Sequence, residues 1–158
     1  MLSALHFLTH IGLSWILANL LPGSRKDRWL VVLAGILPDL DGVGILWSHS
    51  AYLATHRAVG HSLLFGLLLI AIAMLRADRP WRTAALTAIS FHLHLVLDLV
   101  GTGGLPIRYL WPFSDRGWSY QGRWVLASWQ NGLVMAATLG GVLWIAWRRA
   151  RAGRTMSV

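Results

Sequence analysis

Five long apolar stretches divide the chain, and short polar stretches rich in arginine separate them. They cover about residues 3–21, 29–47, 62–76, 83–100 and 124–147. Most of them approach the ~20 residues that a helix needs to cross a bilayer, although the third stretch is short. A Pro-Asp-Leu-Asp-Gly run at residues 38–42 interrupts the second stretch, so we expect a kink or break there. The pattern predicts an all-α integral membrane protein, a single-domain helical bundle of about five transmembrane helices.

The composition agrees with lipid as the solvent. Hydrophobic residues make up 56% of the 158 residues and charged residues only 13%, about half the usual charged share of a soluble domain. The chain contains ten tryptophans, many of them near segment ends, where the aromatic belt of a bilayer protein lies. It contains no cysteine, which excludes disulfides, thiolate zinc sites and cysteine nucleophiles. We expect no cleavable signal peptide, because the first segment lacks a basic start and carries two histidines.

The formal net charge of +8 is distributed between the apolar stretches. Basic residues there set membrane topology and meet anionic headgroups, so we expect membrane lipid and not nucleic acid as the partner. The connections after the first and third segments and the tail carry ten basic residues, whereas the other two connections carry four. The positive-inside rule then predicts a cytoplasmic C-terminus and an N-terminus outside.

The same alternation places every histidine and four of the six acids on the outer side. By chance, polar residues from separate segments would more often divide between the two faces. They lie early in the first segment (His6, His10), at the end of the second (Asp39, Asp41), in the next connection (His56, His61) and late in the fourth segment (His94, Asp98). This convergence predicts a functional site near the outer face of the membrane.

His94 and Asp98 are four residues apart, so on a helix their side chains share one face. A histidine and a carboxylate at this spacing can form a two-ligand clip for zinc or manganese. An isolated pair is equally consistent with a hydrogen bond inside a helix bundle. A carboxylate within a transmembrane segment is costly, however, and normally has a partner or a function.

The run from His56 to Ser62, His-Arg-Ala-Val-Gly-His-Ser, is the densest polar constellation in the chain. The imidazoles of His56 and His61 can bind metal, and Arg57 can hold a phosphate or carboxylate bidentately. Ser62 is positioned to cap the third helix, whose positive end would then face an anion. A purely structural loop has little use for this combination, so we favour a functional role.

The remaining polar positions leave alternatives open. Asp39 and Asp41 could face one cavity from a break at Pro38, or they could form a polar cap at the lipid boundary. His10 is deeper in its segment than His6 and is the better ligand candidate. His6 is at least as consistent with a headgroup-level histidine, His92 with packing behind the site, and His49 stays unassigned.

These motifs in this order, His10, Pro38-Asp39-Leu40-Asp41, His56-Arg57-x-x-Gly60-His61-Ser62 and His94-x-x-x-Asp98, resemble the YdjM-type family of predicted membrane-bound metal-dependent hydrolases. The resemblance implies a small helical inner-membrane protein with a metal site, proposed to be a hydrolase. The positions that match the family pattern are His10, Asp39, Asp41, His56, Arg57, His61, Ser62, His94 and Asp98. Gly60 stands where the family pattern has a threonine.

We expect hydrolysis of a phosphoester, such as a phospholipid headgroup, by water activated on one or two zinc or manganese ions. The expected ligands are His56, His61, His94, Asp98 and Asp39. Asp41 would bridge, ligate or act as general base, His10 would ligate or act as acid, and Arg57 would hold the phosphate. Alternatives are a divalent-cation or proton transporter and a non-enzymatic membrane scaffold. Residues 101–123 are a lid over the site or a loop that rests on headgroups.

Overall fold

The computed structural model describes residues 2–102, 104 and 106–155, and the side chains of residues 6–102, 104 and 106–151. The described helices are α1 (Leu2–Leu20), α2 (Arg25–Ala34), the 3-10 helix η1 (Leu37–Leu46), α3 (His49–Thr55), α4 (Leu63–Arg76), α5 (Pro80–Gly101) and α6 (Trp129–Thr155). Over the same residues there is no strand, only one isolated bridge between Ile107 and Trp118. The prediction of an all-α chain is confirmed.

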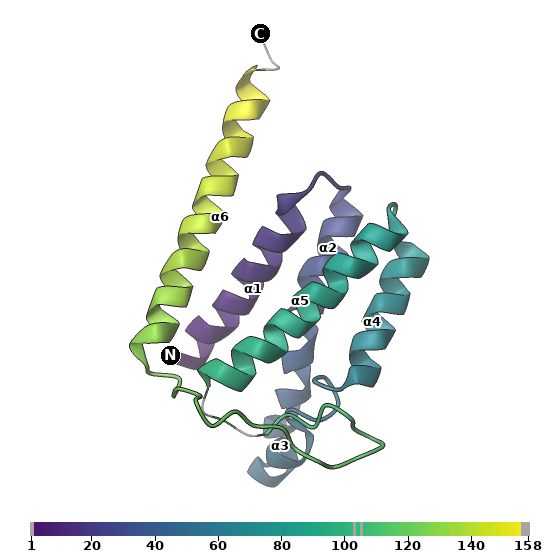
Figure 1. Cartoon of the computed structure of the whole chain (residues 1–158), viewed down its shortest axis with the longest axis vertical. Coiled ribbons are helices and arrows are strands. Elements are labelled where there is room, and N and C mark those ends of the chain that lie inside the picture. Colours follow the sequence, from purple (N-terminus) through teal and green to yellow (C-terminus); the bar gives the residue numbers. More distant parts are fainter. Residues whose placement is uncertain (1, 103, 105, 156–158) are drawn as a thin grey trace.

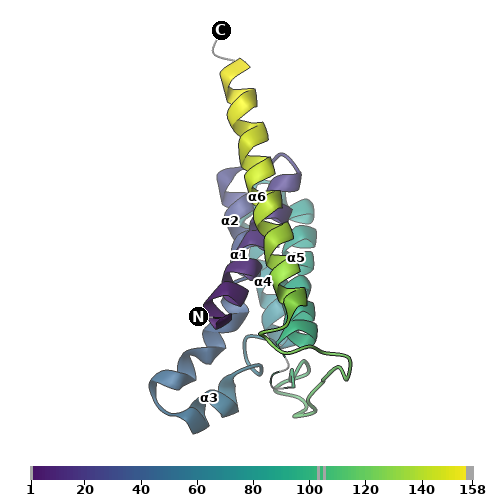
Figure 2. The ribbon, with the colours of Figure 1, turned by 90° about the vertical axis from the view of Figure 1, so that its left-hand side faces the viewer.

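The helices α1, α2, α4 and α5 form a bundle in which α5 packs against each of α1, α2 and α4 (Figure 1). The long α6 lies along α1 and extends past the rest of the bundle toward the C-terminus. The 3-10 helix η1 and the short α3 project from the end at which α1 begins and α5 ends (Figure 2). The connection between α5 and α6 runs across that same end.

Three of the helices begin at a serine whose hydroxyl accepts a backbone N–H from three residues later. These N-caps are Ser24 for α2, Ser48 for α3 and Ser62 for α4. Each satisfies one of the N–H groups that a helix start leaves without an intrahelical partner. The cap that the sequence predicts at Ser62 is therefore confirmed. Ser24 also explains why the second helix begins at residue 25, four residues before the apolar stretch.

The break expected in the second segment is present, but its form differs from a simple turn. The axes of α2 and η1 differ by 51°, and the backbone through residues 38–42 continues as a 3-10 helix. Pro38 stands at the start of η1, where its missing N–H is tolerated. The last segment also differs from the expectation, because α6 begins at Trp129 and not at residue 124.

The interior is more polar and the surface more apolar than in a soluble domain. Among the described side chains, fourteen buried ones are polar or charged and twelve are hydrophobic. Leu75 and Trp81, by contrast, are 82% and 81% exposed. Between α1 and α5 the hydroxyls of Ser14 and Ser90 form a buried hydrogen bond of 3.1 Å. Small polar residues between helices and apolar residues outside are typical of helices that pack within a membrane.

Only part of the predicted five-span topology is confirmed by the described helices. Among them α5 alone is long and apolar enough to cross a membrane, and the bent pair of α2 and η1 would make a second crossing. The helix α4 is apolar but has only 14 residues. In α1, the polar residues His6, His10 and Asn19 lower the hydropathy of an otherwise apolar helix. The structure thus confirms the helices but not five spans.

Candidate metal centre

The carboxylate of Asp98 lies in the last turns of α5 and is almost completely buried. Its Oδ1 atom is 3.3 Å from His6 Nε2 and 3.2 Å from His10 Nε2, both on α1. Its Oδ2 atom is 3.2 Å from His61 Nε2 and 3.2 Å from Arg57 Nη2. One carboxylate therefore faces two separate groups of histidines, one with each oxygen.

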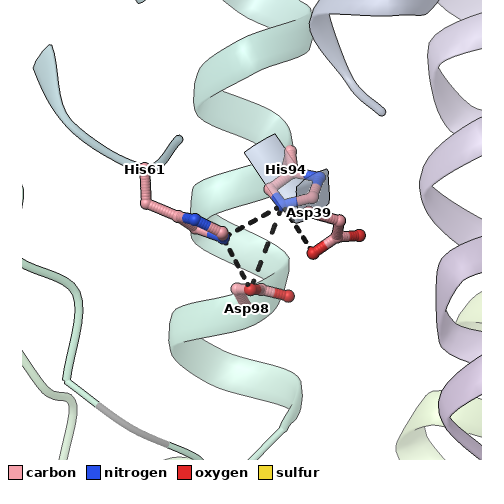
Figure 3. A group of neighbouring side chains, drawn as sticks. All are labelled: Asp39, His61, His94 and Asp98. Atoms are coloured by element: carbon pink, nitrogen blue, oxygen red, sulfur yellow. Dashed lines mark hydrogen bonds and ion pairs between the residues drawn. The ribbon is translucent and has the colours of Figure 1, made fainter. Parts of the chain in front are cut away.

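The first group consists of Asp39, His61, His94 and Asp98, one ligand atom of each lying within 4.8 Å of all the others. Figure 3 shows these four side chains pointing toward one another from η1, the segment before α4, and α5. The Nε2 atom of His94 is 3.5 Å from Asp39 Oδ1 and 3.3 Å from His61 Nε2. Two imidazole nitrogens and two carboxylates at these separations are a donor set that zinc and manganese accept.

Hydrogen bonds at the far side of each ring orient the imidazoles of this group. The Nδ1–H of His94 donates to the carbonyl of Gly35 at 2.9 Å. The Nδ1–H of His61 donates to Asp41 Oδ2 at 3.0 Å. Both arrangements direct Nε2 toward the shared centre, which is how metal-binding histidines are generally held by outer partners.

The second group consists of His6, His10 and Asp98. The rings of His6 and His10 are 4.6 Å apart, and the ring of His10 stacks on His94 at 4.0 Å. Although the two Nε2 atoms are close to Asp98, neither contact has the alignment of a hydrogen bond, and both nitrogens are buried. Buried polar atoms without a hydrogen bond are uncommon in proteins. The two imidazole nitrogens and the Asp98 oxygen instead form a set of three ligand atoms that would fit a bound cation.

Asp41 and His56 are not brought into either group. Asp41 Oδ1 contacts His56 Nδ1 at 2.9 Å, and Oδ2 accepts the backbone N–H of Gly60 at 3.1 Å in addition to His61. Both oxygens of Asp41 are thus used to fix the 56–61 segment against η1. A Cβ atom on Gly60 would lie 2.3 Å from the carbonyl oxygen of Pro38, so this close approach requires glycine.

The charge state of His61 depends on the two carboxylates that flank its ring. Burial of the ring disfavours the charged form, but hydrogen bonds to Asp41 and Asp98 outweigh burial and raise the pKa of His61 to about 9. A cation that takes the Nε2 lone pair therefore competes with a proton at neutral pH.

Arg57 is held in an unusual backbone conformation beside this centre. Its φ of 62° lies in the left-handed region, which costs a non-glycine residue about 1–3 kcal/mol. Its guanidinium donates to the hydroxyl of Thr102 at 2.5 Å in addition to its contact with Asp98. It lines a cavity of about 590 Å³ together with Asp39 and Asp98, and Leu40 and Leu53 form apolar parts of the wall. The arginine thus faces the space next to both histidine groups.

Five of the seven predicted metal ligands, Asp39, His61, His94, Asp98 and His10, therefore lie in the two groups. Sequence reasoning left out His6, although its spacing of four residues from His10 places both on one helix face. His92 is exposed and contacts the Tyr109 hydroxyl at 2.9 Å, and His49 is exposed on α3. Neither of the latter two belongs to a described group.

The connection from 102 to 128 is anchored beside the site. The N–H of Arg108 donates to the carbonyl of Arg57 at 2.8 Å, and the carbonyl of Tyr109 accepts the N–H of Leu63 at 2.7 Å. Thr102, Gly104 and Leu126 contribute to the wall of the cavity. The two alternatives for residues 101–123, a lid and a loop that rests on headgroups, both stay predictions.

Comparison with known proteins places the chain in one family. The family model described as YdjM inner membrane protein matches residues 1–157, almost the complete chain. No curated protein and no solved structure matches it. Because the match covers nearly all of its residues, the chain belongs to the YdjM inner membrane protein family.

Proposed function

We propose that the chain is a membrane-embedded, metal-dependent hydrolase that cleaves a phosphoester, such as the headgroup of a phospholipid. The observation that carries the proposal is the position of Asp98 between the two histidine groups, with one oxygen toward each. A carboxylate shared in this way is suited to hold two divalent cations side by side.

The chemistry of the donors supports zinc or manganese. Histidine nitrogens and carboxylate oxygens are ligands that both metals accept, and the two groups contain no other ligand type among the described residues. The half-buried carboxylate of Asp39 and the buried carboxylate of Asp98 also contribute negative charge that a cation would compensate. Asp41 would act on the centre through His61, which it orients, and would not bind the metal itself.

Divalent cations at such a centre activate water for attack and polarise a phosphoryl oxygen. The guanidinium of Arg57 faces the same cavity and can bind two phosphate oxygens in parallel. Residues Leu40 and Leu53 at the wall would contact the apolar part of a lipid substrate. In this proposal the protein fixes the donors and the arginine in advance, so that few groups have to move during the reaction.

The proposal includes a membrane topology. Five crossings would be formed by α1, α2 with η1, α4, α5 and α6, with the N-terminus outside and the C-terminus in the cytoplasm. The excess of basic residues after the first and third helices and in the tail supports this orientation. The centre would then lie near the outer face, within reach of headgroups.

Elemental analysis of detergent-purified protein, combined with a turnover assay on phosphoester lipids, tests the proposal. The wild type should carry two zinc or manganese ions per chain. Asp98→Ala should lose both ions and all turnover, while His61→Ala should lose at least one. Asp115→Ala, an exposed aspartate in the 102–128 connection, is the matched control and should resemble the wild type. A wild type that stays metal-free after reconstitution, or normal turnover in Asp98→Ala, would overturn the assignment.

A further inference from the structure

A second cavity, of about 210 Å³, lies between α1, α5 and the beginning of α6. Most of its lining is apolar and includes Leu97, Trp129, Val134 and Met135. His6 and Leu126 line this cavity and also the larger cavity at the metal centre. The apolar cavity is therefore directly adjacent to the centre.

The polar side chain at the α6 wall of this cavity is already engaged. The amide of Asn131 donates to the carbonyl of Gly101 at 2.6 Å and accepts the indole N–H of Trp124 at 2.8 Å. These bonds fix the start of α6 against the end of α5. The remaining surface offers mainly carbon atoms to a ligand, which is the chemistry of a site for a hydrocarbon chain.

We infer that this cavity binds one acyl chain of a glycerophospholipid whose phosphate lies at the metal centre. The inference rests on the proposed function and names its substrate class. His6 lies between the metal centre and the apolar cavity, because its Nε2 atom faces Asp98 and the residue also lines the cavity. A short-chain phosphoester would reach the centre but leave the apolar cavity unfilled.

Two glycines of α6 provide a substitution and its matched control. A Cβ atom added at either Gly132 or Gly140 would meet nothing within 4 Å, so neither backbone position excludes a side chain. Gly132 lines the apolar cavity, whereas Gly140, about two turns further along α6, does not. Gly132→Leu should therefore fill the cavity, and Gly140→Leu should add the same side chain to α6 outside it.

The first measurement compares kcat/KM for the dipalmitoyl and dibutyryl forms of the headgroup class that the wild type hydrolyses. Gly132→Leu should lower kcat/KM at least tenfold for the long-chain form and leave the short-chain form unchanged. Gly140→Leu should change neither value. Equal loss for both forms in Gly132→Leu, or no loss for either, would overturn the inference.

The second measurement does not need activity. Phosphatidylglycerol with a diazirine in one acyl chain is photolysed with the protein in nanodiscs, and the labelled residues are mapped. Labelling of Thr9, which is 5% exposed and lines the cavity, should occur in the wild type and Gly140→Leu but be lost in Gly132→Leu. Absence of label at Thr9 in the wild type, or undiminished label in Gly132→Leu, would refute the acyl-chain site. A labelled wild type that hydrolyses no phosphoester would instead refute the proposed function alone.

Discussion

At the scale of single residues, the role of each aspartate depends on which groups its two carboxylate oxygens contact. Asp98 directs its two oxygens to two histidine groups, whereas Asp41 uses both of its oxygens on His56, His61 and Gly60. The two aspartates should therefore respond differently to the same substitution. In the proposed centre, Asp98 would bind the metal ions and Asp41 would orient the ligand His61.

Asp41→Asn should weaken metal binding about 10- to 100-fold without abolishing it, because it alters the partner that orients His61 and not a ligand. Competition with a chelator of known affinity measures the change. The exposed Asp115→Asn serves as the control and should bind metal as the wild type does. A stoichiometry of zero, as expected for Asp98→Ala, would instead make Asp41 a ligand.

Arg57→Lys should keep the metal content but lower kcat/KM about 10- to 100-fold for a phosphoester substrate. Lysine retains the charge and experiences the same left-handed backbone at φ 62°, but it loses the planar fork that binds two phosphate oxygens. Steady-state kinetics and elemental analysis of the same preparations measure both effects. Arg108→Lys, in the neighbouring connection, should leave both unchanged. Loss of metal in Arg57→Lys would show that Arg57 chiefly supports Asp98.

The residue types and spacings predicted that several of these side chains come together, as Asp39, His61, His94 and Asp98 do. Residues His94 and Asp98 share a helix face, and the topology brought the histidines of α1 to the same end. The sequence could not predict whether Asp41 would belong to the donor set or support it. That difference depends on the side of the His61 ring at which the carboxylate lies, and Asp41 lies at Nδ1, away from the other donors. The omission of His6 has another cause, since a histidine near a helix start is also typical of the headgroup region.

At the scale of elements, the position of His94 depends on how closely α2 approaches α1. Its Nδ1–H donates to the carbonyl of Gly35, the C-cap residue that directly follows α2. A Cβ atom on Gly35 would lie 1.7 Å from the hydroxyl oxygen of Ser14 on α1. The helices can therefore pack at this distance only with glycine at position 35.

Gly35→Ala should reduce the free energy of unfolding by about 1–3 kcal/mol, because the new methyl group forces α1 and α2 apart. Thermal unfolding in a single detergent measures the change. Gly140→Ala, where the methyl group meets nothing, should be neutral or slightly stabilising. Ser14→Gly combined with Gly35→Ala should recover part of the loss. Equal stability of the two single variants would contradict the packing argument.

At the N-terminus of α4, the cap residue Ser62 made the helix boundary predictable from the sequence. At the N-terminus of α6, tertiary hydrogen bonds override the hydrophobic pattern, and the predicted boundary was wrong. Residues 124–128 are apolar enough to extend α6, but the N–H of Trp124 donates to the carbonyl of Val100 and Asn131 bonds to the carbonyl of Leu126. These bonds hold the segment against α5. The seven-residue α3 has no buried residue among those described, so it left no periodic signal.

At the scale of the whole molecule, the proposed five-span topology requires the short helix α4 to cross the bilayer. Its 14 residues span about 21 Å, less than the ~30 Å of a bilayer core. It is nevertheless apolar, and exposed Leu64, Leu67 and Leu68 lie along it. A short crossing would leave the polar segment before it, and with it His61, below the level of the headgroups. The lipid phosphates would then lie directly above the centre.

Single cysteines on each side of α4 test this arrangement, since the chain has no native cysteine. Ser50→Cys lies before α4, Ala77→Cys follows it, and Asp115→Cys follows α5. In intact spheroplasts a membrane-impermeant maleimide should label positions 50 and 115 but reach position 77 only after lysis. Labelling of all three before lysis would exclude α4 and α5 as crossings. Labelling of position 77 alone would reverse the orientation and place the metal centre at the cytoplasmic face, where its substrate would have to be a lipid of the inner leaflet.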